Sequence, residues 1–419
     1  MLFLKECQKT ICSLTFVLYV VVIFAMYVSQ FTTELDSPIR RPSPEDGYYG
    51  SIVKEVPEVL MPAAVENLIS EYLAGSYTAY PFMFYKKVKL KESDTEKIAG
   101  IIEVLTDITG SELDHFTEYE AGGYYGQTDE NGNMVMGYKE AVLPEYHLSE
   151  DISYAHFKEL MTQADEIIGK GSMYGEKYLV NFSRIPMTYE DALAEYEELM
   201  DEHHIAKGYV RLYCDYLGID LAIMPVFVCV GLWQMDKRSR MEQLIYSRKV
   251  SSAKLIITRY LALVCCMVVP VALTFIHAMT GLHNLYPEKN IYLGEAVGLA
   301  VMWLLPSIMI VVSVSALISE LLSPLLAIFV QGVWWYAALG KNELTGSITK
   351  YTLIIRHNNL GKTRLFEEKI QDFVWNRTGY FILSLILVGL VILVYEKARK
   401  GNYDWKRNLW KNSRHKSKA

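Results

Sequence analysis

Residues 356–363 end in the triplet Gly-Lys-Thr, which also ends the phosphate-binding loop of many ATPases. That loop needs another glycine five positions before the glycine of the triplet, and Arg356 stands there instead. The backbone cradle for a phosphate is therefore incomplete. We expect no nucleotide site, and no cofactor, on this chain.

His203 and His204 follow Asp201 and Glu202, and all four residue types can bind a metal ion. Neighbouring residues on a helix point about 100° apart, so the two histidines cannot both face one ion unaided. The chain also lacks the His-Glu-x-x-His pattern of metalloproteases and the Gly-x-Ser-x-Gly pattern of hydrolases. We expect an exposed helix end here rather than a metal site, and we do not expect an enzyme.

Ionisable residues inside or beside long apolar runs are the remaining candidates for chemistry. Within a bilayer such groups usually face a bundle interior or an aqueous path, whereas near a span end water reaches them. Both interpretations stay open, and Asp220 is the deepest acid. The candidates for a transport pathway are Asp220, Asp215, His277 and Glu295.

The elements that carry these residues are apolar runs long enough to cross a membrane. The chain of 419 residues is 51% apolar, which favours a membrane protein in contact with lipid. A helix needs roughly 18 to 20 apolar residues to cross the hydrocarbon core. Six windows reach this length, at residues 11–31, 217–235, 255–279, 296–319, 321–340 and 378–395.

Charge predicts the orientation of these spans. Residues 32–210 hold 34 acids and 14 basic residues, a balance of −20, so the remainder carries +13 of the total −7. The amino-terminal flank, the loop after the second span and the tail are basic, and basic loops stay in the cytoplasm. We expect a multi-pass protein of the cell membrane with both termini in the cytoplasm. The predicted parts are residues 1–31, 32–210, 211–340, 341–377, 378–395 and 396–419, of which 32–210 and 341–377 lie outside.

The predicted external domain, residues 32–210, has mixed patterns. Apolar residues recur at helical spacing in 62–73, 93–108 and 152–168. Ser93, with Glu96 three residues on, is the expected cap of the second helix, and Gly169 is the expected end of the third. Thr188 with Asp191 forms a capping-box start for a further helix. Residues 81–90 alternate like a strand, and the Asn131-Gly132 pair predicts a hairpin within 124–142. The overall fold class is therefore predominantly α, with six membrane helices and an inserted α+β domain outside the membrane.

Residues 235–254, between the second and third spans, hold six basic residues and two acids. As a helix, Met241, Leu244 and Ile245 share one side and the charges occupy the rest. This composition is typical of a short amphipathic helix at a membrane surface that docks a soluble partner. An ordinary basic cytoplasmic loop is the alternative.

The stretch 234–260 resembles the loop after the second span in ABC exporter permeases of the type-2 class. In that family a charged cluster leads to a short helix with a Leu-Leu-x-Ser-type run, and the next helix opens with Lys or Arg. Arg240-Met241 replaces the usual Gly-Thr step before that run. The six-span layout with a large external domain after span one is also similar. The resemblance assigns ATPase coupling to Arg240, Met241, Glu242, Leu244, Ile245, Ser247 and Arg248.

The resemblance implies a permease that works with a separate ABC ATPase subunit, which would hold the ATP and Mg²⁺. A second copy or a related permease would complete the pathway, and no nucleic acid is expected. The expected cargo is a peptide, a drug or a lipid-like compound moving outward. The competing hypothesis is a membrane sensor that binds a ligand through its external domain and signals without transport.

Overall fold

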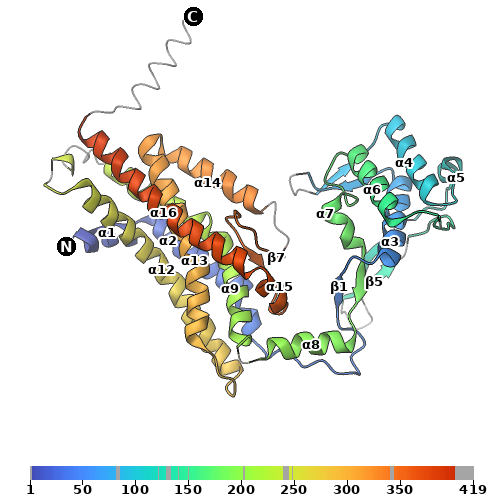
Figure 1. Cartoon of the computed structure of the whole chain (residues 1–419), viewed down its shortest axis with the longest axis horizontal. Coiled ribbons are helices and arrows are strands. Elements are labelled where there is room, and N and C mark those ends of the chain that lie inside the picture. The colour runs from blue at the N-terminus through green and yellow to red at the C-terminus, as the bar shows by residue number, and fades with distance from the viewer. Residues whose placement is uncertain are drawn as a thin grey trace, which may run out of the picture. The chain divides into compact units, whose positions relative to one another are not determined.

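Figure 1 shows the computed structural model of the chain. It describes residues 2–81, 85–120, 122–128, 134–139, 141–149, 151–201, 203–238, 245–247, 249–339 and 344–401. The fold is predominantly helical, as predicted. The chain forms two compact units: unit 1 is Met1–Arg41 with Leu193–Ala419, and unit 2 is Pro42–Ala192.

Unit 1 is built from long apolar helices joined by short connections. Its helices are α1 (Leu2–Ile11), α2 (Leu14–Gln30), η1 (Thr32–Leu35), α9 (Ile205–Leu221), α10 (Met224–Arg238), α12 (Ser252–Leu285), α13 (Leu293–Leu321), α14 (Pro324–Leu339), α15 (Thr363–Glu368) and α16 (Ile370–Arg399). Two short strands, β7 (Thr345–Ser347) and β8 (Arg356–His357), pair antiparallel between α14 and α15.

Four helical segments in the described part of the chain are long and apolar enough to cross a membrane: Ile205–Met235, α12, α13 and α16. The bent pair α1–α2 makes a fifth if it is counted as one span. The predicted span 321–340 corresponds to α14, whose 16 residues fall short of the usual length. The structure thus supports a membrane protein with four or five spans, and the predicted count of six is not confirmed.

The first predicted span, residues 11–31, corresponds to α2, and a break at its start separates it from the preceding helix α1. Helices α1 and α2 meet at an angle of 67° around Ser13. The Ser13 side chain accepts a hydrogen bond from the Phe16 amide and so starts α2 as a new helix. In α1, Glu6 and Thr10 are buried, while Leu4 is 70% exposed. This helix therefore packs on α12 through polar residues and leaves apolar ones at its surface.

Helix α13 lies at the centre of unit 1, where it packs against α9, α10, α12, α14 and α16 (Figure 1). The second predicted span is longer than its apolar window, because the helix begins at Ile205 rather than at residue 217. It is interrupted between α9 and α10, and α14 covers the break. Gln331 donates to the Ala222 carbonyl at 2.6 Å and Trp335 to the Ile219 carbonyl at 2.9 Å. These hydrogen bonds satisfy carbonyls that have no helical donor at the break and that lie in an apolar environment.

Unit 2 has its own core of buried aliphatic and aromatic side chains, contributed mainly by α3, α4 and α6. Its helices are α3 (Pro57–Leu73), α4 (Glu92–Leu105), α5 (Gly110–His115), α6 (Tyr154–Ile168), α7 (Glu176–Leu179) and η3 (Val180–Phe182). Its strands pair as β1 (Ser51–Val53) with β6 (Arg184–Pro186), β2 (Tyr77–Ala79) with β3 (Lys86–Val88), and β4 (Gly123–Thr128) with β5 (Met134–Lys139), all antiparallel. Helix α8 (Tyr189–Leu199) begins in unit 2 and ends in unit 1.

Several local predictions for unit 2 are confirmed. The β4–β5 hairpin forms around the Asn-Gly pair, which itself lies outside the described residues. Gly169 ends α6 at φ +114, a conformation that glycine adopts without strain. Thr188 and Asp191 exchange the hydrogen bonds expected of a capping box. The predicted cap at Ser93 is wrong, because α4 already begins at Glu92.

Candidate functional site

Unit 1 has two ends that differ in chemistry. We call the end that holds Phe31, Ile205 and Leu293 the insertion end, because the chain leaves for unit 2 and returns there. We call the end that holds Arg238 and Ser252 the loop end, because residues 239–251 connect α10 to α12 there.

Most of the predicted coupling residues fall outside the described part of the chain. Arg240, Met241, Glu242, Leu244 and Arg248 are among them, so their coupling role stays a prediction. Ile245 and Ser247 belong to the described piece 245–247, and Ile245 packs against the core of unit 1.

The end of α16 holds Tyr246 and Val250, in the part of the loop that precedes α12. Arg399 donates from Nε to the Tyr246 carbonyl at 3.0 Å and from Nη1 to the Val250 carbonyl. The Tyr246 ring packs edge-on against the buried Tyr395 ring at 5.5 Å. The loop thus contacts α16, a helix more than a hundred residues later in the sequence.

A polar cluster, largely buried, lies between the helices that flank the loop. We call it the loop-end cluster, and its members are Glu6, Trp233, Arg259 and Glu320. Arg259 Nε lies 3.2 Å from Glu6 Oε2, and both side chains are less than 5% exposed. The Arg259 guanidinium lies over the Trp233 ring at 5.3 Å, and Trp233 Nε1 donates to Glu320 at 2.6 Å.

Each member of the loop-end cluster comes from a different helix: α1, α10, α12 and α13. A buried ion pair holds a definite geometry, because either partner alone would be a desolvated charge, and a hydrogen bond to a carboxylate is stronger than one between neutral groups. The helix that enters the loop and the helix that leaves it are therefore tied to each other and to two further helices.

Asp215, a predicted pathway residue, is fully buried in α9 at the insertion end. Its Oδ1 accepts hydrogen bonds from Arg356 Nε at 2.9 Å and from the His357 amide at 2.6 Å. Both donors belong to strand β8. Asp215 therefore anchors the segment between α14 and α16.

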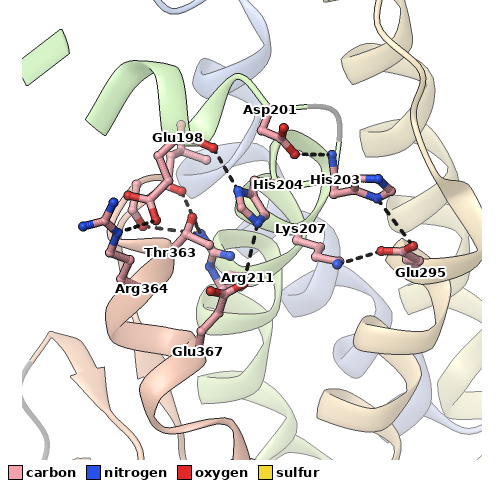
Figure 2. A network of polar contacts seen from close by, with 12 residues as sticks. Glu198, Asp201, His203, His204, Lys207, Arg211, Glu295, Thr363, Arg364 and Glu367 are labelled. Atoms are coloured by element: carbon pink, nitrogen blue, oxygen red, sulfur yellow. Dashed lines mark hydrogen bonds and ion pairs between the residues drawn. The ribbon is translucent and has the colours of Figure 1, made fainter. Parts of the chain in front are cut away.

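The other three pathway candidates lie in separate surroundings. Asp220 is half-buried in the last turn of α9, and its Oδ2 has no hydrogen-bond partner in the described chain. His277 Nδ1 lies 2.6 Å from the Tyr27 hydroxyl and borders a hollow of about 410 Å³. Glu295, in the first turn of α13, pairs with Lys207 at 2.7 Å (Figure 2).

The structure therefore does not bring the four predicted pathway residues together. Two arginines outside the predicted spans instead contact one and the same segment of the chain. Arg211 and Arg377 are each 1% exposed and donate to backbone carbonyls of the segment between α14 and α16. Both lie just before an apolar window in the sequence. An earlier predicted start for each helix, before its apolar window, would have placed these arginines inside the bundle.

His357 lies fully buried beside Arg211 and Asp215. Burial lowers the pKa of His357 to about 4, and the positive charge of Arg211 acts in the same direction. The ring is therefore neutral near pH 7, and its Nε2 lies 3.2 Å from the Gly361 carbonyl as a donor. This histidine supports the segment rather than acting as a charged group.

Within the described ranges, no cluster of three His, Cys, Asp or Glu side chains could hold a metal ion. Comparison with protein-family models, curated proteins and solved structures found no match to this chain.

Proposed function

We propose that this chain is the membrane permease subunit of an ATP-driven ABC exporter, with a separate ATPase docked on residues 235–254. Two observations carry the proposal. Arg399 and Tyr395 hold Tyr246 and Val250 of this loop on α16. The loop-end cluster joins α10 and α12, the helices at the two ends of the loop, to each other and to α1 and α13. A docking loop must pass force to the spans, and these contacts offer a route for it.

The charge distribution supports the orientation that this function needs. At the loop end, α10 leads into the basic stretch 235–254, α1 carries Lys5 and Lys9, and α16 ends within the basic stretch 396–419 of the sequence. Lys and Arg are enriched in cytoplasmic loops, so the loop end is assigned to the cytoplasm, where ATP is available. Unit 2 then lies outside the membrane, and the cargo leaves at the insertion end.

In this proposal, ATP binding draws two ATPase subunits together and moves residues 235–254. The loop-end cluster passes that movement to α10, α12 and α13, and a second permease copy or a related chain completes the pathway. A peptide, a drug or a lipid-like compound is the proposed cargo. The nucleotide and Mg²⁺ belong to the partner.

The experiment that tests the proposal is co-purification from the native cell in mild detergent. We expect an ABC ATPase to accompany the tagged chain at a fixed ratio, and Glu242→Lys to abolish that association or the ATP hydrolysis stimulated by the permease. A matched Glu103→Lys variant, which changes an exposed acid of unit 2, should leave both unchanged. Absence of an ATPase from the wild-type preparation would refute the permease function.

A membrane sensor is the second candidate function. It is favoured by one observation: unit 2 has its own hydrophobic core and joins unit 1 through the continuous helix α8. A sensor of this kind would bind its ligand in unit 2 and would not require an ATPase. The co-purification experiment separates the two functions.

A further inference from the structure

Residues 344–369, between α14 and α16, form an irregular segment that packs into the insertion end of unit 1. Leu353, Ile354 and Ile355 are each 1% exposed, and Arg356 and His357 are buried as well. Irregular backbone at membrane depth is tolerated only where other groups satisfy its hydrogen bonds. The donors and acceptors around this segment show how that requirement is met.

The carbonyls of the segment receive donors from the helices on either side. Arg377 Nη2 donates to the Leu353 carbonyl at 3.2 Å, and Asn376 donates to the Thr352 carbonyl at 2.9 Å. From α9, Arg211 Nη2 donates to the Leu360 carbonyl at 3.1 Å. The 344–369 segment is therefore a fitted part of the bundle.

A second set of contacts joins the segment to the end of α8 and the turn that follows it (Figure 2). Arg364 Nε lies 3.6 Å from Glu198 Oε1, and Glu367 Oε1 lies 3.6 Å from His204 Nε2, an ion pair when the ring is protonated. Thr363 Oγ1 accepts from Arg211 at 3.0 Å. All three contacts involve α15.

The last turn of α8 is also where both connections to unit 2 converge. Helix α8 itself is the returning connection, and Arg41, the last residue of unit 1 before unit 2, pairs with Glu197 at 3.0 Å. Adjacent residues of one turn, Glu197 and Glu198, thus contact the departing chain and α15 respectively. A rotation of α8 imposed by unit 2 would strain the contacts to α15.

We propose that the last turn of α8 and α15 form a latch through which unit 2 controls the seating of the 344–369 segment at the insertion end. In the closed state seen here, Glu198 and His204 hold α15, and β8 stays buried on Asp215. Turning α8 releases α15 first, because the contacts of α15 are the most exposed. The buried contact between β8 and Asp215 is released after it. This latch goes beyond the proposed permease function, because it would serve a sensor equally.

Hydrogen exchange on the full-length protein in lipid nanodiscs tests the latch without an ATPase or a substrate. Glu198→Arg and Arg364→Glu should each raise the exchange rate about threefold to fivefold, the range expected for an ion pair near water. Coupling is reciprocal, so the rise should appear both in residues 344–360 and in α8. The double variant Glu198→Arg/Arg364→Glu restores the opposite charges and should return both regions to the wild-type rate.

The control is the pair of Lys350 and Asp372, at 3.7 Å, which joins the same segment to α16 and does not involve α8. Asp372→Lys should raise exchange in the segment and should raise it in α8 by less than Arg364→Glu does, because it leaves the contacts between α8 and α15 in place. Unchanged exchange in α8 on Arg364→Glu, or a double variant that exchanges as fast as the single ones, would overturn the latch. Both single variants alter partly exposed side chains, so we expect both to fold. A folding failure would be recognised because it would raise exchange in all peptides and not in these two regions alone.

Discussion

Replacing Arg259 with glutamine should break the contact that joins α1 to α10 and α12 at the loop end. The change removes the positive charge that lies 3.2 Å from Glu6 and over the Trp233 ring. Loss of one partner from a buried ion pair costs about 3–5 kcal/mol of stability, because the other charge stays desolvated. Lys9 remains 2.9 Å from Glu6 Oε1 and compensates in part. We therefore expect the low end of that range, about 3 kcal/mol.

The assay is reversible unfolding of the purified protein in mixed micelles, followed by tryptophan fluorescence. The double variant Glu6→Gln/Arg259→Gln removes both charges and should recover at least about 1 kcal/mol relative to Arg259→Gln alone, as expected for residues in direct contact. Arg184→Gln, a change at an exposed arginine of unit 2, is the control and should cost less than about 0.5 kcal/mol. A loss below about 1 kcal/mol for Arg259→Gln, or an additive double variant, would refute the reasoning.

Three further predictions concern other parts of the chain. Asp215→Asn should cost about 3 kcal/mol, because it leaves the Arg356 charge buried without its carboxylate, and hydrogen exchange in residues 344–360 should rise with it; wild-type exchange there would contradict the anchoring role. Gly208→Ala places a methyl group 2.8 Å from the Leu360 carbonyl, so we expect a loss of about 1–3 kcal/mol in the micelle assay, whereas unchanged stability would show that the segment shifts freely. In unit 2, burial raises the pKa of Glu71 above its ordinary value of 4.5, so the folded chain keeps that proton to higher pH than the unfolded chain does. Its contribution to stability is full below the ordinary pKa and falls as the pH rises through the raised pKa. Glu71→Gln should therefore flatten the stability of unit 2 against pH just above 4.5, and an unchanged slope in thermal unfolding would contradict this assignment.

Sequence patterns were sufficient where the deciding interactions are local. Hydropathy located α12, α13 and α16, and nearest-neighbour chemistry located the cap at Thr188 and the glycine end of α6. These features depend on residues within one or two turns of each other. A single sequence shows such contacts directly.

Long-range contacts decide the parts that the sequence did not predict. Residues 341–377 were expected to be an external loop, and the burial of Leu353–Ile355 within them was not predicted. The adjoining strand is held by Asp215, which lies 141 positions from Arg356. The helix α1 was not predicted, because its residues precede the apolar window and mix polar with apolar side chains. Buried Glu6 looked like part of a solvated flank, since its partner Arg259 lies 253 positions away.

The most direct test of the proposed ATPase partnership is photo-crosslinking from residue 242 in intact cells. A photoreactive phenylalanine analogue replaces Glu242, and the same analogue at exposed Val104 of unit 2 serves as the control position. The proposal predicts a crosslink from position 242 to a protein with a phosphate-binding loop, and no such product from position 104. Crosslinks from position 242 to lipid alone, or the same products from both positions, would contradict it.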